Sequence, residues 1–153
     1  MIFREMCYDD KFSVQYFFDI MGEESASFFN VDKGNEKRVM SFFENGKPDH
    51  RFYVAKDGDE TAGICFLWDI DRSMPMFGIA VREDYKGKGV GTFMLGSTFE
   101  LLKAGGYGGM LLTTEKSNIK ARGLYEKCGF ECLGVHNNGE LLYIKRFGGY
   151  GNG

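Results

Sequence analysis

The sequence has few of the residues that mark metal-binding and secreted proteins. Its 153 residues include 2 prolines, 2 histidines, 1 tryptophan and 4 cysteines, and no two cysteines form a CxxC pair. His50 and His136 stand alone, without the regular spacing of zinc ligands. We therefore expect no metal site, and four reduced thiols in a cytoplasmic protein.

The chain also lacks a long apolar segment and an excess of positive charge. Its longest uninterrupted apolar run, 64–68, is far shorter than the ~20 residues that cross a bilayer. The start, Met1–Glu5, shows no basic residue followed by a long apolar stretch, so we expect no secretory signal. A net charge of −3 argues against a general nucleic-acid-binding protein, in which Lys and Arg side chains must neutralise many phosphates. We expect neither a membrane nor a nucleic acid as partner.

The sequence does have enough apolar bulk for one compact domain. Hydrophobic residues make up 43% of the chain and aromatic residues 16%. A chain of this size normally forms a single domain and needs no disulfide or metal to fold. We expect one domain over 1–147, followed by a frayed glycine-rich tail over 148–153.

Hydrophobic periodicity predicts a mixed α/β domain. Asp9–Asp10 are expected to cap the first helix, and 57–60 is a hairpin signal, while 25–31 fits neither pattern. The order β-α-α-β-β-β-α-β-α-β-β indicates one mixed sheet. The expected strands are 2–7, 52–55, 61–69, 74–81, 110–114, 130–135 and 141–146, and the expected helices are 11–21, 35–45, 90–104 and 118–127.

A glycine-rich loop over 85–91 joins a predicted strand to a predicted helix. Without a Cβ, Gly87, Gly89 and Gly91 let an anion approach the backbone N–H groups, and the helix N-terminus adds partial positive charge. Lys86 and Lys88 add full charges. The loop favours a phosphate or pyrophosphate ligand.

Three other interpretations of this loop compete with a phosphate site. A P-loop needs GxxxxGK[ST], but Val90–Gly91 follow Gly89, so no hydroxyl is placed to hold magnesium. A dinucleotide fold needs GxGxxG inside a parallel unit, whereas this spacing is GxGxG after a predicted antiparallel meander. A flexible turn without a ligand is the third.

Two motifs resemble one known family. The segment 86–91 (KGKGVG) resembles the (Gln/Arg)-x-x-Gly-x-(Gly/Ala) motif of the GCN5-related N-acetyltransferase (GNAT) superfamily, with Lys86 where Gln or Arg is usual. About 27 residues after Gly91, the segment 118–130 (NIKARGLYEKCGF) resembles the same family's second motif. The resemblance covers about 51–147, and the first 50 residues match only in the order of their elements.

The resemblance implies a fold and a function. The fold is a GNAT-like α/β domain over 1–147 with splayed central strands. The function is an acyltransferase reaction, the direct transfer of an acetyl group from acetyl-CoA, the cosubstrate, to a primary amine of a small molecule or peptide, by a monomer or a homodimer. The residues that this resemblance implies for coenzyme binding are Ile79, Ala80, Val81, Lys86, Gly87, Lys88, Gly89, Val90, Gly91, Asn118 and Tyr125.

The resemblance also implies roles in the chemistry. Tyr125 is the family's usual general acid, a phenol near the coenzyme sulfur, although a packed helix face would also explain it. Asn118 is expected to cap its helix and to touch the coenzyme; capping alone would also explain it. A backbone N–H near Ile79 or Ala80 is expected to stabilise the thioester oxygen.

The general base is not evident in the sequence. Many family members carry a glutamate at one of two positions, which are occupied here by Pro75 and Thr113. Glu115 is the best remaining candidate; Asp69 and Asp71 are the other nearby carboxylates. A water route, or an amine that arrives neutral, would need no base.

The sequence leaves alternatives open for both the acceptor amine and the activity. The family's acceptor region, formed by the first two helices, contains an acidic pair, Glu23–Glu24, that could attract a cationic amine. One alternative function is a non-catalytic acyl-CoA-binding or sensor domain; another is a nucleotide-binding module that uses the glycine loop alone. The other residues noted in that acceptor region are Phe17, Phe18, Phe28 and Phe29.

Overall fold

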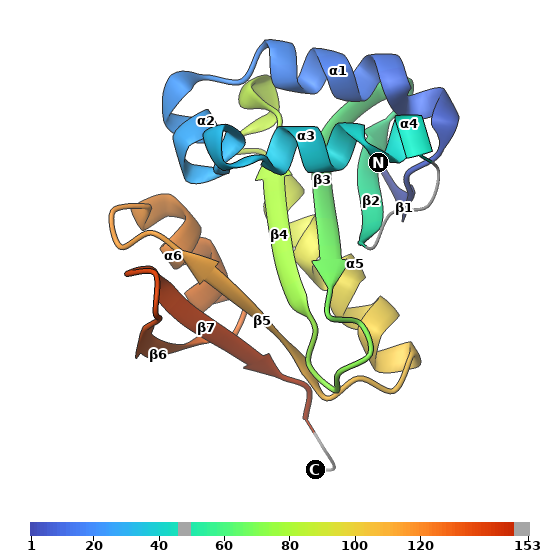
Figure 1. Ribbon diagram of the computed structural model, residues 1–153. Coiled ribbons are helices and arrows are strands. Elements are labelled where there is room, and N and C mark those ends of the chain that lie inside the picture. Colours follow the sequence, from blue (N-terminus) through green and yellow to red (C-terminus); the bar gives the residue numbers. More distant parts are fainter. Residues whose placement is uncertain (46–49, 149–153) are drawn as a thin grey trace. The chain divides into compact units, whose positions relative to one another are not determined.

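A computed structural model describes residues 1–45 and 50–148 of the chain. Seven strands are hydrogen-bonded in the order β1-β2-β3-β4-β5-β7-β6 (Figure 1). This mixed sheet with its helices confirms the predicted α/β class. Two compact units make up the chain, the first from 1–66 and 79–94 and the second from 67–78 and 95 onward. The predicted domain over 1–147 stays a prediction, and all of the predicted tail except Gly148 lies outside the described residues.

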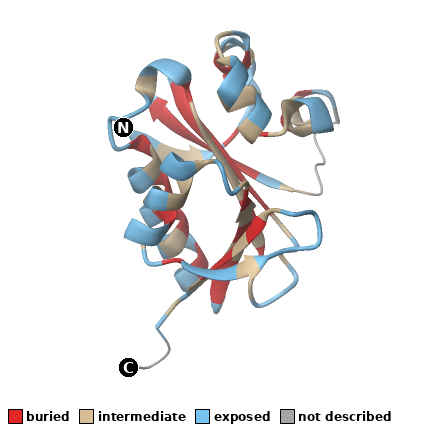
Figure 2. Cartoon of the chain, turned by 90° about the vertical axis from the view of Figure 1, so that its left-hand side faces the viewer, coloured by how far each residue is buried: buried red, intermediate tan, exposed pale blue. Residues whose placement is uncertain are grey.

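The strands of the first unit form an antiparallel meander. Strand β1 (Ile2–Glu5) pairs with β2 (Arg51–Asp57), with Ile2 opposite Lys56. Strand β3 (Glu60–Trp68) follows β2 after the predicted hairpin turn. The interior residues of β2 and β3 are buried without a break, so both faces of these strands are covered (Figure 2).

Four helices follow β1 in the first unit. They are α1 (Lys11–Asp19), α2 (Glu23–Phe28), α3 (Asn35–Met40) and α4 (Phe42–Asn45), and α1 packs against α3 (Figure 1). Helix α2 occupies much of the segment that the sequence left undecided. The single helix predicted over 35–45 is wrong, because it breaks at Ser41. The Ser41 hydroxyl donates to the carbonyl of Arg38 at 2.6 Å, a local bond that competes with regular helix geometry.

Aromatic rings fill the core of the first unit. Rings from α1 and from the end of α2 meet rings from β2 and β3. Gly63 on β3 leaves room for the Met94 side chain, because a Cβ at Gly63 would overlap the Met94 sulfur. This close approach seats the first turn of α5 (Val90–Ala104) on β3. The rings in contact are Phe17, Phe18, Phe29, Phe52 and Phe66.

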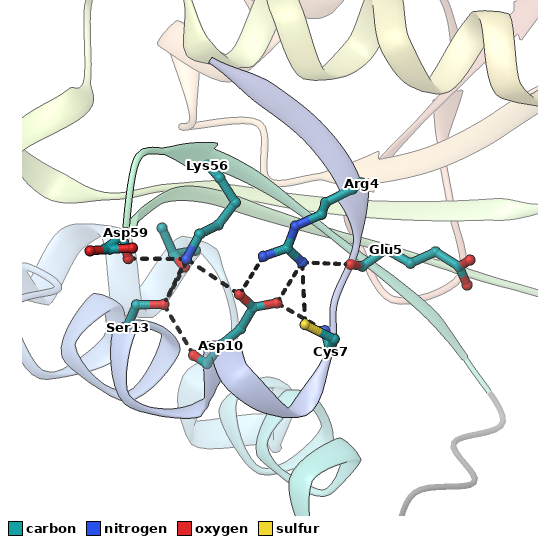
Figure 3. Close-up of polar contacts among 8 residues, drawn as sticks. Arg4, Glu5, Cys7, Asp10, Ser13, Lys56 and Asp59 are labelled. Carbon is teal, nitrogen blue, oxygen red and sulfur yellow. Dashed lines mark hydrogen bonds and ion pairs between the residues drawn. The ribbon is translucent and has the colours of Figure 1, made fainter.

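A buried polar cluster holds the start of α1 (Figure 3). Asp10 occupies the N-cap position of α1, as predicted, and although its carboxylate makes no capping bond to α1, it completes the capping box of the 3-10 turn Tyr8–Asp10 that leads into the helix. It accepts hydrogen bonds from the Arg4 guanidinium at 2.8 and 2.7 Å and from the N–H of Cys7 at 2.9 Å. The Lys56 ammonium lies 3.3 Å from the same carboxylate and donates to Ser13 at 3.2 Å. The cluster joins β1, α1 and β2.

The second unit is built on strand β5 (Gly109–Thr114). Strand β7 (Leu141–Arg146) pairs with β5 along its whole length, and β6 (Glu131–Val135) pairs with β7. The start of β4 (Met76–Val81) pairs in parallel with β5 at Met76 and Leu111. The expected splaying of the central strands stays a prediction.

Helix α5 ends and α6 begins as the sequence predicts. Gly106 follows α5 with a φ of +83°, and the N–H of Tyr107 donates to the carbonyl of Leu102 at 3.0 Å. Helix α6 spans Ile119–Lys127. Aromatic rings on and beside α5, α6 and β7 contact one another in this unit, and three of them, Tyr125, Phe130 and Tyr143, are buried in its core. The rings in contact are Phe99, Tyr125, Phe130, Tyr143 and Phe147.

Candidate functional site

The glycine loop lies in the first unit, between β4 and α5. Gly87 and Gly89 have φ values of +75° and +82°, which side chains rarely adopt. A Cβ at either residue would meet no heavy atom within 4 Å, so backbone conformation, and not crowding, requires glycine here. Residues 86–89 are all exposed. The positive φ values let the chain turn sharply into α5.

The N-terminus of α5 provides backbone groups that can bind an anion at this loop. The carbonyl of Gly89 accepts the N–H of Phe93 at 3.0 Å, which closes the first helical turn. The N–H groups at the start of an α-helix have no partners within the helix and carry partial positive charge. Val90 and Gly91 lie in this first turn. Backbone donors, an open approach and two lysines form a donor set that fits a pyrophosphate.

A buried arginine anchors the segment that precedes the loop. Arg82 is 5% exposed and donates to Asp84 at 2.7 and 2.9 Å and to Glu60. Its guanidinium lies 5.2 Å from the Tyr16 ring centre and 4.9 Å from that of Tyr85. The hydrogen bond from Arg82 is the main cause that lowers the pKa of Asp84. These contacts tie the loop to α1 and to the β2–β3 hairpin.

The two loop lysines have different neighbours. The Lys86 ammonium donates to the Ser25 hydroxyl and lies 3.9 Å from Glu83. The Lys88 ammonium lies 5.7 Å from the centre of the Tyr85 ring. The ammonium of Lys86 therefore already has an anionic neighbour, whereas the ammonium of Lys88 lies near an aromatic ring of the same segment.

The predicted backbone contacts for the coenzyme arm lie at the end of β4. Ile79, Ala80 and Val81 are half-buried, and the N–H of Arg82, the next residue, donates to the carbonyl of Ala62 at 2.8 Å. Their role in coenzyme binding stays a prediction.

Tyr125 lies on α6 in the second unit and is 7% exposed. Its ring packs against Phe130 at 5.6 Å and Tyr143 at 6.0 Å between centres. Burial raises the pKa of this phenol, and the neighbouring Tyr143 adds to the rise. Like an unperturbed phenol, this side chain carries its proton at neutral pH.

Three residues that the sequence did not single out position this part of α6. Tyr143 of β7 is fully buried, and its hydroxyl donates to Glu126 at 2.8 Å. Arg122 donates to the same hydroxyl at 3.2 Å and to the carbonyl of Lys116 at 2.9 Å. These bonds join α6 to β7 beside Tyr125. The spacing of residues in the sequence could not predict these bonds, because each of them joins residues of different elements.

The turn between β5 and α6 holds the other predicted residues of this unit. Asn118 occupies the N-cap position of α6, as predicted, but its side chain makes no capping bond. Its N–H donates to the carbonyl of Glu115 at 3.0 Å. Glu115 is half-buried, just beyond β5. Thr113 pairs with Leu142.

The structure changes the interpretation of the predicted acceptor region. Phe17, Phe18 and Phe29 are buried in the core and pack on each other and on β3, so they do not line an open pocket. Glu23 and Glu24 are exposed on the first turn of α2.

The described residues contain neither a candidate metal site nor a candidate membrane-spanning helix. No group of three or more His, Cys, Asp or Glu side chains is placed to hold a metal ion within 1–45 and 50–148. In the same part of the chain, no helix has both the length and the apolar character needed to cross a membrane.

The family follows from a match that contains both motifs. Residues 15–130 match the model of the acetyltransferase (GNAT) family. This chain belongs to that family. The match includes the whole glycine loop and all of α6, the two segments whose local geometry is described above.

Two curated relatives are similar over part of their length. A Bacillus subtilis protein, whose name describes a [ribosomal protein bS18]-alanine N-acetyltransferase, is 32% identical over 89 residues, 58% of this GNAT chain and 58% of the relative. N-alpha-acetyltransferase 30 of Schizosaccharomyces pombe is 31% identical over 100 residues, 61% of this chain and 65% of the relative. The chain thus spans less than two thirds of the length of these relatives.

Solved structures share the fold over nearly the whole GNAT chain. The GNAT domain of S. lividans PAT superposes with a TM-score of 0.80 at 14% identity, covering 95% of this chain and 89% of that one. The PaiA N-acetyltransferase of Thermoplasma acidophilum, solved in complex with coenzyme A, gives a TM-score of 0.73 at 16% identity, covering 95% and 98%. At these identities the likeness shows the fold.

Proposed function

We propose that this chain is an N-acetyltransferase that transfers an acetyl group directly from acetyl-CoA to a primary amine. The observation that carries the proposal is the loop of Gly87 and Gly89 at the start of α5, whose positive φ values turn the chain into a helix N-terminus. Membership of the GNAT family supports acetyl-CoA as the ligand of this loop. Lys86, Lys88 and the N–H groups of the first turn of α5 would hold the pyrophosphate.

Tyr125 would supply the proton that the reaction needs. The acetyl thioester brings an activated acyl group. In the transfer, Tyr125 gives its hydroxyl proton to the coenzyme sulfur as the carbon–sulfur bond breaks and the bond from the amine nitrogen to the acetyl carbon forms. The proton of the amine goes to water, and Tyr125 regains one from water. A phenol carries its proton at neutral pH, and Tyr125 lies on the helix that the family match includes.

The backbone N–H near Ile79 or Ala80 would stabilise the charge that develops on the acetyl oxygen. Asn118 would contact the coenzyme from the start of α6. Glu115 would be the base if a protein base acts. No side chain of the expected acceptor region identifies the amine, so its class has to be measured.

The names of the two relatives suggest which amines to test. One name describes acetylation of an alanine of a ribosomal protein, and the other an N-alpha-acetyltransferase. We propose peptides with a free N-terminus as one acceptor class and small amines as the other. A homodimer stays one possible assembly in this proposal.

A thiol-release assay with a panel of amines tests the proposal. The panel contains short peptides with N-terminal alanine, polyamines, aminoglycosides, amino acids and amino sugars. Acetyl-CoA-dependent release of the thiol with at least one class is the expected result. Coenzyme A binding with no turnover across the panel would favour the sensor alternative. Binding of ATP without binding of coenzyme A would favour the nucleotide-binding alternative.

A further inference from the structure

Lys86 has two neighbours, Ser25 and Glu83. Its ammonium donates to the Ser25 hydroxyl and lies 3.9 Å from a carboxylate oxygen of Glu83. Ser25 belongs to α2, whereas Glu83 lies between β4 and the glycine loop. All three residues belong to the first unit. The lysine at the family's motif position is thus already in contact with an anion.

Glu83 is held in place by the start of α2. One carboxylate oxygen accepts the N–H of Gly22 at 2.8 Å and the Ser25 hydroxyl at 3.0 Å. A Cβ at Gly22 would lie 3.0 Å from that oxygen, so a side chain at this position would press on the carboxylate. The bonds fix the Glu83 carboxylate beside Lys86.

The Glu83–Lys86 pair is weak enough to be exchanged for another anion. The two side chains are 41% and 44% exposed, and a pair with that exposure adds at most about 1 kcal/mol. Lys86 directly precedes Gly87, so its backbone is part of the proposed phosphate loop. A pyrophosphate carries more negative charge than one carboxylate and presents several acceptor oxygens.

We propose that Glu83 competes with the pyrophosphate of the coenzyme for Lys86 and so sets the affinity of the loop. In the free protein, Lys86 is held by Ser25 and Glu83. When the loop holds a pyrophosphate, Lys86 turns to it, and Glu83 keeps its bonds to Gly22 and Ser25. The inference rests on the proposed function, because it takes the loop to be a phosphate site.

The experiment measures binding by calorimetry in Glu83→Gln, with coenzyme A and with inorganic pyrophosphate as separate probes. Glutamine keeps the oxygen that Gly22 and Ser25 need and removes the charge that holds Lys86. We expect Glu83→Gln to bind both probes about threefold more tightly, which corresponds to an exposed ion pair of about 0.7 kcal/mol. Ser25→Ala, which removes the other partner of Lys86, serves as a second variant and should also tighten binding.

The tighter binding in Glu83→Gln must depend on Lys86. In a Lys86→Met background, the same Glu83→Gln change should alter affinity by less than about 1.5-fold. Asp59→Asn is the matched control, because it removes an exposed carboxylate of the same unit that contacts neither Lys86 nor Arg82. Equal tightening by Asp59→Asn, or by Glu83→Gln in the Lys86→Met background, would mean general charge repulsion and would overturn the competition.

The two probes separate this inference from the proposed function. If the wild type binds pyrophosphate but not coenzyme A, and Glu83→Gln tightens that binding through Lys86, the competition stands and the acetyl-CoA assignment fails. If coenzyme A binds and Glu83→Gln leaves both affinities unchanged or weaker, the competition fails and the assignment stands. A wild type that binds neither probe overturns both.

Discussion

The guanidinium of Arg4 donates two hydrogen bonds to the carboxylate of Asp10, at 2.8 and 2.7 Å (Figure 3). Asp10 is 1% exposed, and Lys56 brings a second positive charge to it. A buried carboxylate with two cations and a backbone N–H is satisfied only while it is ionised. The stability of the first unit therefore depends on the charge of Asp10.

The first prediction concerns the pH dependence of stability. Burial by itself raises the pKa of Asp10, but the hydrogen bonds from Arg4 and Cys7 and the charges of Arg4 and Lys56 lower it to about 2, from an ordinary value of 3.8. The unfolded chain takes up this proton first as the pH falls. The contribution of Asp10 is thus complete above about pH 4 and is lost between about pH 4 and pH 2.

Denaturant unfolding at several pH values checks this dependence. Asp10→Asn should lower the free energy of unfolding at neutral pH by about 2–3 kcal/mol, because Arg4 and Lys56 lose their buried partner. It should also flatten the fall in stability below pH 4. Asp9→Asn is the matched control, since it removes an exposed neighbouring carboxylate. If the free energy of unfolding of Asp10→Asn falls below pH 4 as steeply as that of the wild type, the pH dependence does not come from the charge of Asp10.

The second prediction concerns the glycine loop. Gly89→Val or Gly91→Val should block the approach of a pyrophosphate to the backbone and raise the Kd of coenzyme A at least about tenfold. The matched control is Gly139→Val in the β6–β7 turn, because Gly139 has a φ of +86° and suffers the same backbone strain as Gly89. Calorimetry on folded variants makes the comparison. An unchanged coenzyme A affinity in Gly89→Val would remove the loop assignment.

The third prediction concerns Tyr125. Tyr125→Phe keeps the ring contacts with Phe130 and Tyr143 and removes only the hydroxyl. If that hydroxyl protonates the leaving thiolate, kcat should fall by roughly 10²- to 10⁴-fold, with little change in coenzyme A binding. The control is Tyr107→Phe, which removes a hydroxyl that donates to Ile70 at 2.7 Å. A loss of less than about threefold would leave Tyr125 with a packing role.

Local pattern was enough to predict most elements and the glycine loop. The loop follows from glycines at positions of positive φ next to an apolar helical repeat, which are properties of adjacent residues. The break at Ser41 was missed, because a serine hydroxyl can bond its own helix without interrupting the apolar spacing.

Contacts between distant residues were outside what the sequence could predict. Ser25 and Lys86 are 61 positions apart, and Arg122 and Tyr143 are 21 apart, so periodicity cannot relate them. Asp10 was predicted at the correct helix end, but its bonds to Arg4 on the preceding strand were not predicted. Its carboxylate also accepts the N–H of Cys7, which caps the turn that leads into α1 and not α1 itself.

The last prediction concerns the general base. Pro75 and Thr113 occupy the positions where the family often carries a glutamate, and neither side chain can take a proton. We expect that no single carboxylate substitution abolishes activity, and that the amine loses its proton to water. Glu115 is the best candidate for the opposite case, since it is half-buried just beyond β5.

The pH dependence of kcat/KM for two acceptors of different pKa separates these cases. If water takes the proton, the rate rises toward the pKa of each amine, and the inflection moves when the acceptor is changed. A protein base gives an inflection that belongs to the enzyme and stays fixed. Glu115→Gln is compared with Glu140→Gln, which removes a half-buried carboxylate directly before β7. An inflection that stays fixed in the wild type and vanishes only in Glu115→Gln would make Glu115 the base.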